Sequence, residues 1–442
     1  AGFGSPVVFE SAAIAYGPPV DVFDTNSNKV VIAYGDGGNS YYGTAVVGTV
    51  SGTSITFGTP VVFVSAKPGR LGSFGITFDS NSNKVVIAYG DDGNSNYGTA
   101  IVGTVSGTSI SFGSAVVFES ATTPFISAIF DSNSNKVVIA YNDAGNSNYG
   151  TAIVGTVSGS SISFGTPVVF ASHTAYYFAT TFDSILNKVV IIYYNGSSAG
   201  EGTAIVGTVS GTSISFGSAV EFNSGATSQF GATFDSNSNK VVIAYRNGLG
   251  SFSYGIVGTV SGTSITFGSA VEFNDGSIGY TISVVFDSSL NKVIFAYRDA
   301  GNSNYGTIIS GTVSGTSISF ESSIVFESAA TSWIATSFDS NSNRVVISYA
   351  DGGNSNYGTG IVFKDGSTNL TAENFIGFAN GAAADTGTAR VQIGSGINGA
   401  QSSLTAGQQY FVQTDGTIGL TAADPSVIAG TAISATEIIV KG

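Results

Sequence analysis

The sequence predicts an all-β protein: a seven-bladed β-propeller of four-stranded blades, followed by a small C-terminal β domain. The first observation is a repeat, because the pair Phe-Asp recurs seven times, with aspartates spaced 55 residues apart once and 52 residues apart five times. Periods of this length are typical of propellers and solenoids. The second is that each copy holds four short runs rich in Val, Ile, Thr, Phe and Tyr, separated by turn-forming residues. The third is that no stretch sustains a helical period.

The copy around Asp79 shows the four expected strands. They are 72–79 (GSFGITFD), 83–89 (NKVVIAY), 97–105 (YGTAIVGTV) and 109–118 (SISFGSAVVF). Seven copies of four strands match a seven-bladed propeller.

The two ends of the repeat array complement each other. The chain opens with FGSPVVFES, which matches the fourth-strand phrase FGSAVVFES that begins at Phe112, and the last copy stops after its third strand, at Phe363. We therefore expect the N-terminal strand to complete the seventh blade, which leaves no unpaired edge in the ring. A register with this strand innermost also gives seven blades. We prefer the first because the hairpin VSGTSISFGSAVVF resembles the Asp-box hairpin of sialidase-type propellers, although its Asp is missing from every copy.

Composition excludes several classes of function. The net charge is −14 and only 10% of residues are charged, so a nucleic-acid partner, which needs clustered Lys and Arg, is not expected. There is no Cys, which excludes disulfides and thiol catalysis, and the single His makes a zinc site improbable. No apolar run approaches the length of a membrane span, so we expect no membrane insertion. No glycine-rich phosphate loop is present either.

One face of the propeller is nearly invariant between copies, and its turn reads D-S-N-S-N-K. We expect a cross-strand charge pair between the Asp and the base of each turn. These structural pairs are Asp24 and Lys29, Asp79 and Lys84, Asp131 and Lys136, Asp183 and Lys188, Asp235 and Lys240, Asp287 and Lys292, and Asp339 and Arg344. A calcium loop also begins D-x-N-x-N, but its sixth position needs Gly and its twelfth Glu, where the copy at Asp79 has Lys84 and Gly90. We therefore interpret the phrase as turn chemistry, with Asn in the left-handed conformation.

The copies differ on the opposite, variable face. Its loops read like D-A-G-N-S-N-Y-G, and each blade-to-blade connection brings an aromatic residue toward the expected central opening. These aromatics are Tyr16, Phe74, Phe125, Tyr176, Tyr177, Phe230, Tyr280 and Trp333. Rigid rings beside Asn, Asp and Ser are typical of surfaces that bind sugars or proteins. The alternative is that the rings cap the central channel as a hydrophobic plug.

Several charged residues of the variable face depart from the repeat. They are His173, Glu201, Arg246 and Arg298, together with Lys67 and Arg70 in a longer connection, 66–73. Departures can mark a site that symmetry does not provide, or they can be drift in an unconstrained loop. A polysaccharide-acting enzyme would need Arg246, Arg298 and Glu201 to converge in one cleft, with paired carboxylates 5–10 Å apart. Nothing else in the sequence indicates catalysis, so we expect no catalytic residue, no metal site and no cofactor beyond a Ca²⁺ ion that acidic loops could hold.

The repeat stops after Phe363, so the expected domains are 1–363 and 364–442. The C-terminal segment has strand-like runs at 389–395, 409–416 and 436–442 and a hairpin turn at 414–417. At this size it is marginal as an independent fold, so we expect it to pack on the propeller or on another chain.

The wording of the C-terminal segment also carries a resemblance. The phrases SSLTAGQQYFVQTDGTI and DPSVIAGTAISATEIIV resemble a small β module of tail fibres and other virion proteins of tailed phages, and the repeats are similar to those of structural proteins of marine phages. The resemblance implies an extracellular, virion-exposed protein that binds a host surface glycan or protein. It also implies contacts with other virion proteins through 364–442 and a possible homo-oligomer. The alternatives are a capsid or tail decoration protein without a receptor, and a secreted enzyme.

Overall fold

The computed structural model describes residues 2–69, 74–197, 199–248, 252–365, 377–379, 391–392, 394, 396–413, 417–422 and 427–441. The all-β prediction is confirmed, because the helical residues in these ranges form four short 3-10 helices. These are η1 (Gly37–Asn39), η2 (Asp92–Asn94), η3 (Ala144–Asn146) and η4 (Gly352–Asn354). None of the described helices is long and apolar enough to cross a membrane. The chain divides into two compact units, Gly2–Lys364 and Asp365–Gly442.

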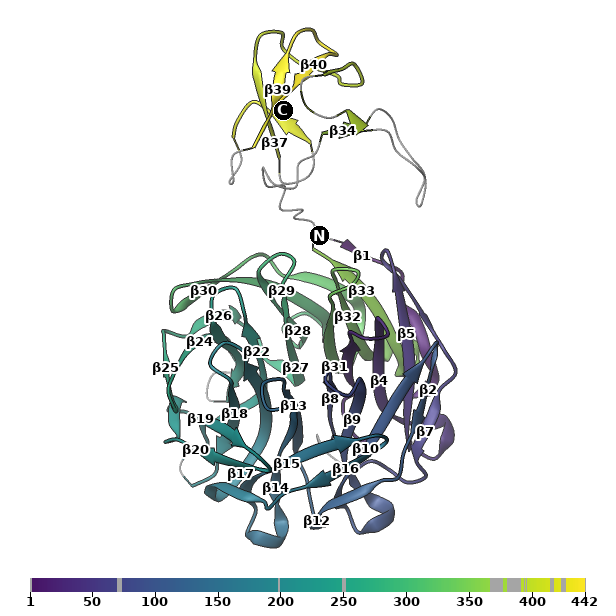
Figure 1. Ribbon diagram of the computed structural model, residues 1–442, viewed down its shortest axis with the longest axis vertical. Helices are drawn as coiled ribbons and strands as arrows, with labels where there is room; N and C mark the ends of the chain where they lie inside the picture. Colours follow the sequence, from purple (N-terminus) through teal and green to yellow (C-terminus); the bar gives the residue numbers. More distant parts are fainter. Residues whose placement is uncertain are drawn as a thin grey trace. The chain divides into compact units, whose positions relative to one another are not determined.

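The larger unit consists of strand sets with one shared antiparallel pairing pattern (Figure 1). Seven sets lie within the described residues, numbered here in chain order. The innermost strands are β3 (Val20–Asp24), β8 (Phe74–Asp79), β13 (Ile126–Asp131), the second half of β17 (Val168–Asp183), β22 (Thr227–Asp235), β27 (Ile278–Asp287) and the second half of β31 (Ile324–Asp339). The second strands are β4 (Lys29–Asp36), β9 (Lys84–Asp91), β14 (Lys136–Asp143), β18 (Lys188–Asn195), β23 (Lys240–Asn247), β28 (Lys292–Asp299) and β32 (Arg344–Asp351).

The outer half of each set follows the same rule. The third strands are β5 (Tyr42–Ser51), β10 (Tyr97–Ser106), β15 (Tyr149–Ser158), β19 (Glu201–Ser210), β24 (Ser253–Ser261), β29 (Tyr305–Ser314) and β33 (Tyr357–Lys364). Each outermost strand is broken into two segments that pair with the same third strand. These segments are β6 (Ser54–Phe57) with β7 (Val61–Val64), β11 (Ser109–Phe112) with β12 (Val116–Thr122), β16 (Ser161–Phe164) with the start of β17, β20 (Ser213–Phe216) with β21 (Val220–Asn223), β25 (Ser264–Phe267) with β26 (Val271–Asn274), β30 (Ser317–Phe320) with the start of β31, and β1 (Gly2–Phe3) with β2 (Val7–Ala13).

The innermost strands form a closed circle. Each contacts the innermost strand of the next set, and β31 of the last set contacts β3 of the first. The N-terminal strands complete set 7 as its outermost member, because Phe3 pairs with Phe363 and Val7 pairs with Gly360. The alternative register, with the N-terminal strand innermost, is therefore wrong.

The second strands read as continuous apolar runs because they are buried on both faces between neighbouring sets. Their tyrosines, such as Tyr89 and Tyr141, are fully buried. An aromatic triad recurs at each junction between sets. Phe118 of set 2, for example, lies 5.2 Å from Tyr141 and 5.6 Å from Phe164 of set 3. At the last junction Phe326 contacts Tyr349 and Phe3, so the N-terminal segment supplies the missing ring.

The D-S-N-S-N-K turns owe their sequence to the backbone. Asp79 is 2% exposed, and its Oδ1 accepts hydrogen bonds from the backbone N–H groups of Asn81 and Ser82, at 2.9 Å each. Asn83 has φ 56°, as the left-handed interpretation predicted, and the same arrangement recurs in every set.

The predicted charge pairs are absent from six of the seven turns, so the prediction is wrong there. Among the described residues, no ion pair joins Asp24 to Lys29, Asp79 to Lys84, Asp131 to Lys136, Asp183 to Lys188, Asp235 to Lys240, or Asp339 to Arg344. The Asp oxygens face the backbone donors, while bases such as Lys188 and Arg344 donate to Thr208 Oγ1 and to the Gly52 carbonyl. Lys292 forms an ion pair with Glu321.

The smaller unit has its own core of Tyr410, Val412, Ala429 and Ile438 with their neighbours. Its strands are β34 (Phe378–Ala379), β35 (Val391–Gln392), β36 (Ile397–Asn398), β37 (Gln409–Val412), β38 (Ile418–Gly419), β39 (Ile428–Ala432) and β40 (Ile438–Val440). Each of the three predicted strand runs contains one of these strands. The predicted turn at 414–417 lies mostly outside the described residues.

Candidate functional site

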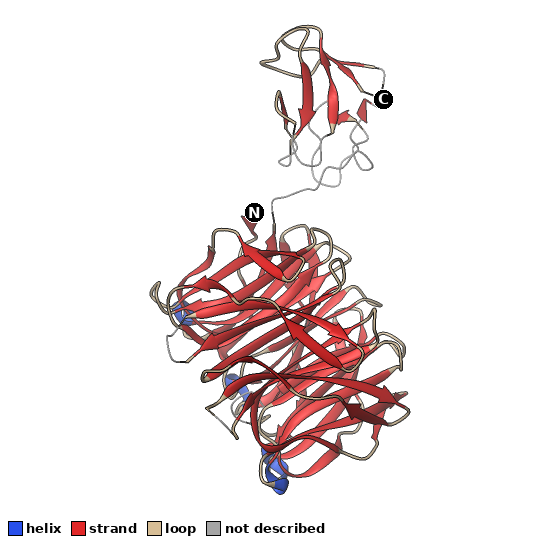
Figure 2. Cartoon of the chain, turned by 90° about the vertical axis from the view of Figure 1, so that its left-hand side faces the viewer, coloured by secondary structure: helices blue, strands red, loops and turns tan. Residues whose placement is uncertain are grey.

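The variable face is built by the loops between second and third strands and by the connections between sets. In four of these loops an Asp caps a 3-10 helix, as where Asp36 Oδ1 accepts a hydrogen bond of 2.8 Å from the Gly38 backbone N–H. Figure 2 shows the short helices along one side of the stacked sheets. The capped loops give this face a rigid frame.

Strained backbone recurs where the connections enter the innermost strands. Tyr16, Phe125, Tyr177, Gln229 and Trp333 all have φ between 53° and 67°, a region that bulky residues rarely adopt. At Tyr177, Gln229 and Trp333 the residue lies in a β-bulge. Bulges of this kind re-aim side chains and cluster next to functional sites. Strain costing about 1–3 kcal/mol per residue is retained at equivalent places around the ring.

Four aromatic rings gather where sets 3 and 4 meet. Phe125 lies 5.3 Å from Tyr176 and 4.9 Å from Tyr177, and the Tyr194 ring lies 6.0 Å and 6.2 Å from the same two tyrosines. Tyr177 is 36% exposed, whereas the other three rings are half-buried. We call these four residues the aromatic cluster. It offers one exposed ring held by three supporting rings.

Sequence reasoning found Phe125, Tyr176 and Tyr177 but missed Tyr194. The sequence could have indicated Tyr194, because it is the one aromatic residue at a position where the other copies have Gly, Asn, Arg or Ala.

Other predicted aromatics occupy different environments. Phe74 is 4% exposed and belongs to a core cluster, so it is not part of an exposed surface and its predicted ligand role is a correction. Phe230 and Trp333 are half-buried and pack against core clusters. These three side chains therefore pack within the strand sets and differ from the exposed Tyr177. The side chain of Tyr280 lies outside the described residues, as does Arg70.

The predicted charged residues come from three different strand sets. Arg246 and Arg298 end the second strands of sets 5 and 6, and Glu201 begins the third strand of set 4. Arg298 Nε donates to Asn304 Oδ1 of its own loop, at 2.9 Å, and the three pockets described here are lined without any of these residues. His173 lies near the aromatic cluster in sequence, with its ring 6.1 Å from that of Tyr193 and Nδ1 3.2 Å from the Thr174 carbonyl.

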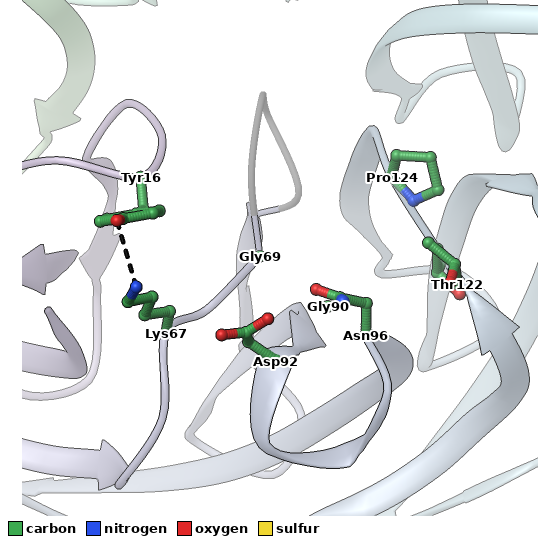
Figure 3. A pocket seen from close by; sticks show the side chains of 9 residues that line it. Tyr16, Lys67, Gly69, Gly90, Asp92, Asn96, Thr122 and Pro124 are labelled. Atoms are coloured by element: carbon green, nitrogen blue, oxygen red, sulfur yellow. Dashed lines mark hydrogen bonds between the residues drawn. The ribbon is translucent and has the colours of Figure 1, made fainter.

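A pocket of about 340 Å³ opens on the variable face around the loop of set 2. Figure 3 shows Tyr16 and Lys67 on one wall, Thr122 and Pro124 on the opposite wall, and Asp92 and Asn96 between them. Lys67 Nζ lies 3.1 Å from Tyr16 Oη and 4.5 Å from the centre of its ring. The pocket therefore combines apolar surface with a positively charged donor, Lys67, and a negatively charged acceptor, Asp92.

Three junctions of the variable face share a hydrogen bond between a buried tyrosine and a half-buried glutamate. Tyr34, Tyr141 and Tyr349 donate to Glu10, Glu119 and Glu327, at 3.1–3.2 Å. Burial raises the pKa of Glu10 and of Glu119, and the neighbouring Asp36 and Asp143 raise each further. Where Val64 replaces the glutamate, the buried Tyr89 hydroxyl has no partner among the described residues. No group of three potential metal-binding side chains occurs in the described ranges.

The central channel holds two more pockets, of about 270 and 200 Å³. Hydroxyl residues and apolar residues such as Phe178 and Phe230 line the larger one, and pairs of hydroxyls bridge sets, as where Ser127 Oγ lies 2.9 Å from Thr180 Oγ1. The smaller pocket reaches Asp21, the one acidic residue among its lining side chains.

Comparisons with known proteins place the fold. No protein-family model matches the chain, and no curated protein matches it by sequence. Among solved structures, the BP39L lectin of Burkholderia pseudomallei is similar at 11% identity with a TM-score of 0.58, over 76% of this chain and 94% of that one. SapL1 lectin in complex with alpha methyl fucoside (11% identity, TM-score 0.44, 72% and 97%) and an arginine mutant of AofleA from Arthrobotrys oligospora (8%, 0.47, 73% and 90%) are also similar. At these identities the likeness to BP39L shows the fold alone.

Proposed function

We propose that this protein binds carbohydrate through the variable face and is not an enzyme. The observation that carries the proposal is the aromatic cluster. Tyr177 presents its ring to solvent and is held by Phe125, Tyr176 and Tyr194 at centroid distances of 4.9–6.4 Å. A fixed aromatic ring stacks on the apolar C–H face of a sugar and loses little conformational entropy on binding.

The surroundings of the cluster support the same class of ligand. His173 and Asn195 lie close to the cluster in the chain and are half-buried, and both carry polar groups of the kind that bind sugar hydroxyls. The positive φ of Phe125 and Tyr177 recurs at Gln229 and Trp333, so the fold itself sets the backbone that carries these two rings. The solved structure with the similar fold is itself called a lectin.

The architecture that we infer is a seven-bladed β-propeller, with each strand set as one blade. The contact of β31 with β3 and the pairing of β1 and β2 with β33 support a closed ring. Electron-microscopy averages viewed down the central axis would count the blades, and any number other than seven would overturn this assignment.

The binding proposal is tested with the full chain on a broad glycan array. We expect binding to a subset of glycans that Tyr177→Ala weakens at least tenfold. Ile185→Asn is the matched control, because Ile185 is 55% exposed on the opposite face and Asn stands at this position in the copy at Asp79. No binding by the wild-type chain, or equal loss in both variants, would overturn the proposal. Mass spectrometry of bound glycans should find them uncleaved, and cleavage would make the protein an enzyme.

We also propose, from the sequence resemblance, that the protein is exposed on a phage virion and that 364–442 attaches it there. The C-terminal unit supports an attachment role, because it has a hydrophobic core of its own residues. Proteomics and immunogold labelling of purified particles test this. A protein absent from the particles would overturn it, and particle-bound protein that binds no host glycan would favour the decoration alternative.

A further inference from the structure

The pocket around Asp92 lies where departures from the repeat converge. The connection between sets 1 and 2 is the longest of the connections between sets, and it contributes Lys67. Lys67 is the one lysine of the strand-set unit that belongs neither to a D-S-N-S-N-K turn nor to the end of β33. Asp92 stands where the equivalent loops have Gly37, Ala144 or Gly352. The pocket is therefore a single site that the symmetry of the fold does not supply.

The frame of the pocket is held by the backbone, not by the side chains that face it. The Asp92 N–H donates to the Lys67 carbonyl at 3.1 Å, and the Thr123 N–H donates to the Asn96 carbonyl at 3.0 Å. On one wall, the Tyr16 ring packs edge-on against Tyr41 at 4.7 Å. A site fixed in this way binds without a large ordering cost.

The functional groups favour a neutral, polyhydroxylated ligand. Asp92 is exposed in the pocket and can accept two hydroxyl hydrogen bonds, Lys67 and Asn96 can donate, and the Tyr16 and Pro124 rings offer apolar surface. A carboxylated ligand would meet the exposed carboxylate of Asp92 in the pocket. A volume of about 340 Å³ lies at the low end of the roughly 300–1,000 Å³ of small-molecule sites, which suits one sugar ring and not a long chain.

We propose that the pocket formed by Tyr16, Lys67, Asp92, Asn96, Thr122 and Pro124 binds one neutral sugar ring through its hydroxyls and discriminates against carboxylated sugars. The inference rests on the proposed carbohydrate binding but concerns a second site, separate in sequence from the aromatic cluster.

The test is isothermal titration calorimetry of the full chain with methyl galactopyranoside, methyl glucopyranoside, methyl mannopyranoside and methyl fucopyranoside, and with galacturonic and glucuronic acids. Asp92→Ala introduces the residue that the third copy has at Ala144, so the loop is compatible with the change. We expect Asp92→Ala and Lys67→Ala each to weaken binding of a neutral sugar at least tenfold, and Asp92→Asn to reduce the preference over the uronic acid. Ala144→Asp, which places an acid in the matching loop of set 3 without a lysine from that connection, is the control and should leave binding unchanged.

The outcomes separate the two proposals. If Tyr177→Ala abolishes all sugar binding and the Asp92 and Lys67 variants bind as the wild type does, the pocket proposal is wrong and the aromatic cluster stands. If the wild type binds a uronic acid more tightly than its neutral counterpart, the proposed discrimination is wrong. If no sugar binds the wild type in calorimetry or on the array, both proposals fall.

Discussion

Ser348 Oγ donates a hydrogen bond of 2.8 Å to Asp21 Oδ2, which joins the last strand set to the first. Asp21 lies on β3 and Ser348 on β32, so this contact spans the place where the ring closes. The other carboxylate oxygen, Asp21 Oδ1, is shielded from solvent and has no partner among the described residues. Burial raises the pKa of Asp21 to about 7, although the Ser348 hydrogen bond opposes the shift. The place where the last set meets the first therefore contains a carboxyl group whose ionisation the fold disfavours.

The first prediction is that stability falls as pH rises through the pKa of Asp21. In the unfolded chain this carboxyl has its ordinary pKa of 3.8, whereas in the folded protein burial raises the pKa to about 7. Folding is therefore penalised progressively above pH 4, and the penalty is complete above pH 7. Asp21→Asn, which stays neutral and can still accept from Ser348, should be more stable than the wild type at pH 8 by on the order of 2 kcal/mol. Urea unfolding at pH 4 and pH 8 measures the difference.

The same experiment contains its control, because all other titrating groups are common to both proteins. The stability difference between Asp21→Asn and the wild type should grow between pH 4 and pH 8. A difference that stays constant across this range would show that Asp21 keeps an ordinary pKa in the folded protein.

The second prediction concerns the glycine that begins the break in the outermost strand of every set but the sixth. A Cβ on Gly268 would lie 1.9 Å from the Thr316 carbonyl oxygen of the next set, so Gly268→Ala forces two sets apart. We expect a loss of about 1–3 kcal/mol in the free energy of unfolding. Set 6 has Glu321 at this position. Its neighbour, set 7, has no turn between third and outermost strands, because the chain leaves through Lys364 and enters at Gly2.

Glu321→Gly is the matched variant for this prediction. It removes an ion pair to Lys292 from a side chain that is 51% exposed, and should cost less than about 1 kcal/mol. Equal costs for Gly268→Ala and Glu321→Gly would contradict the close approach of neighbouring sets.

Much of the fold could be predicted because the same strand pattern recurs in seven copies of the repeat. The period, the strand patterns and the complementary ends predicted that the N-terminal strand completes the last set, and the resemblance of one hairpin to the Asp-box hairpin favoured the outermost position. The charge pairs were not predictable in this way. Asp79 and Lys84 are opposite each other in the hairpin, but the buried carboxylate satisfies two backbone N–H groups instead. Pattern alone does not tell which of two donors a carboxylate accepts from.

The third prediction tests the glutamate–tyrosine hydrogen bonds. Glu119→Val introduces the residue that set 1 has at Val64 and leaves the buried Tyr141 hydroxyl without its partner. We expect a cost of about 1–2 kcal/mol, because an unsatisfied buried polar group is expensive. The reverse change, Val64→Glu, supplies an acceptor to Tyr89 and should cost less than Glu119→Val. Chemical denaturation of both variants checks this, and a larger cost for Val64→Glu would contradict it.

The candidate site was only partly predictable from the sequence. The variable face and most aromatic positions followed from the repeat register, but burial did not, since Phe74 and Tyr177 occupy similar connections and only Tyr177 is exposed. The backbone alone does not decide this, because Trp333 lies in the equivalent bulge with φ 55° and its side chain packs against a core cluster. A left-handed residue that is not Gly or Asn leaves no recognisable signal in one sequence.

The fourth prediction uses that backbone directly. At ordinary positions glycine is less stabilising than alanine by about 0.5–1 kcal/mol, but at φ 54° the order reverses, because alanine bears the left-handed strain and glycine does not. Tyr177→Gly should therefore be more stable than Tyr177→Ala by roughly 1 kcal/mol, while both lose glycan binding to the same extent. Paired measurements of unfolding and of array binding check this. If Tyr177→Ala were the more stable of the two, the strained backbone would be excluded; if only Tyr177→Ala lost binding, the exposed ring would not be the group that contacts the sugar.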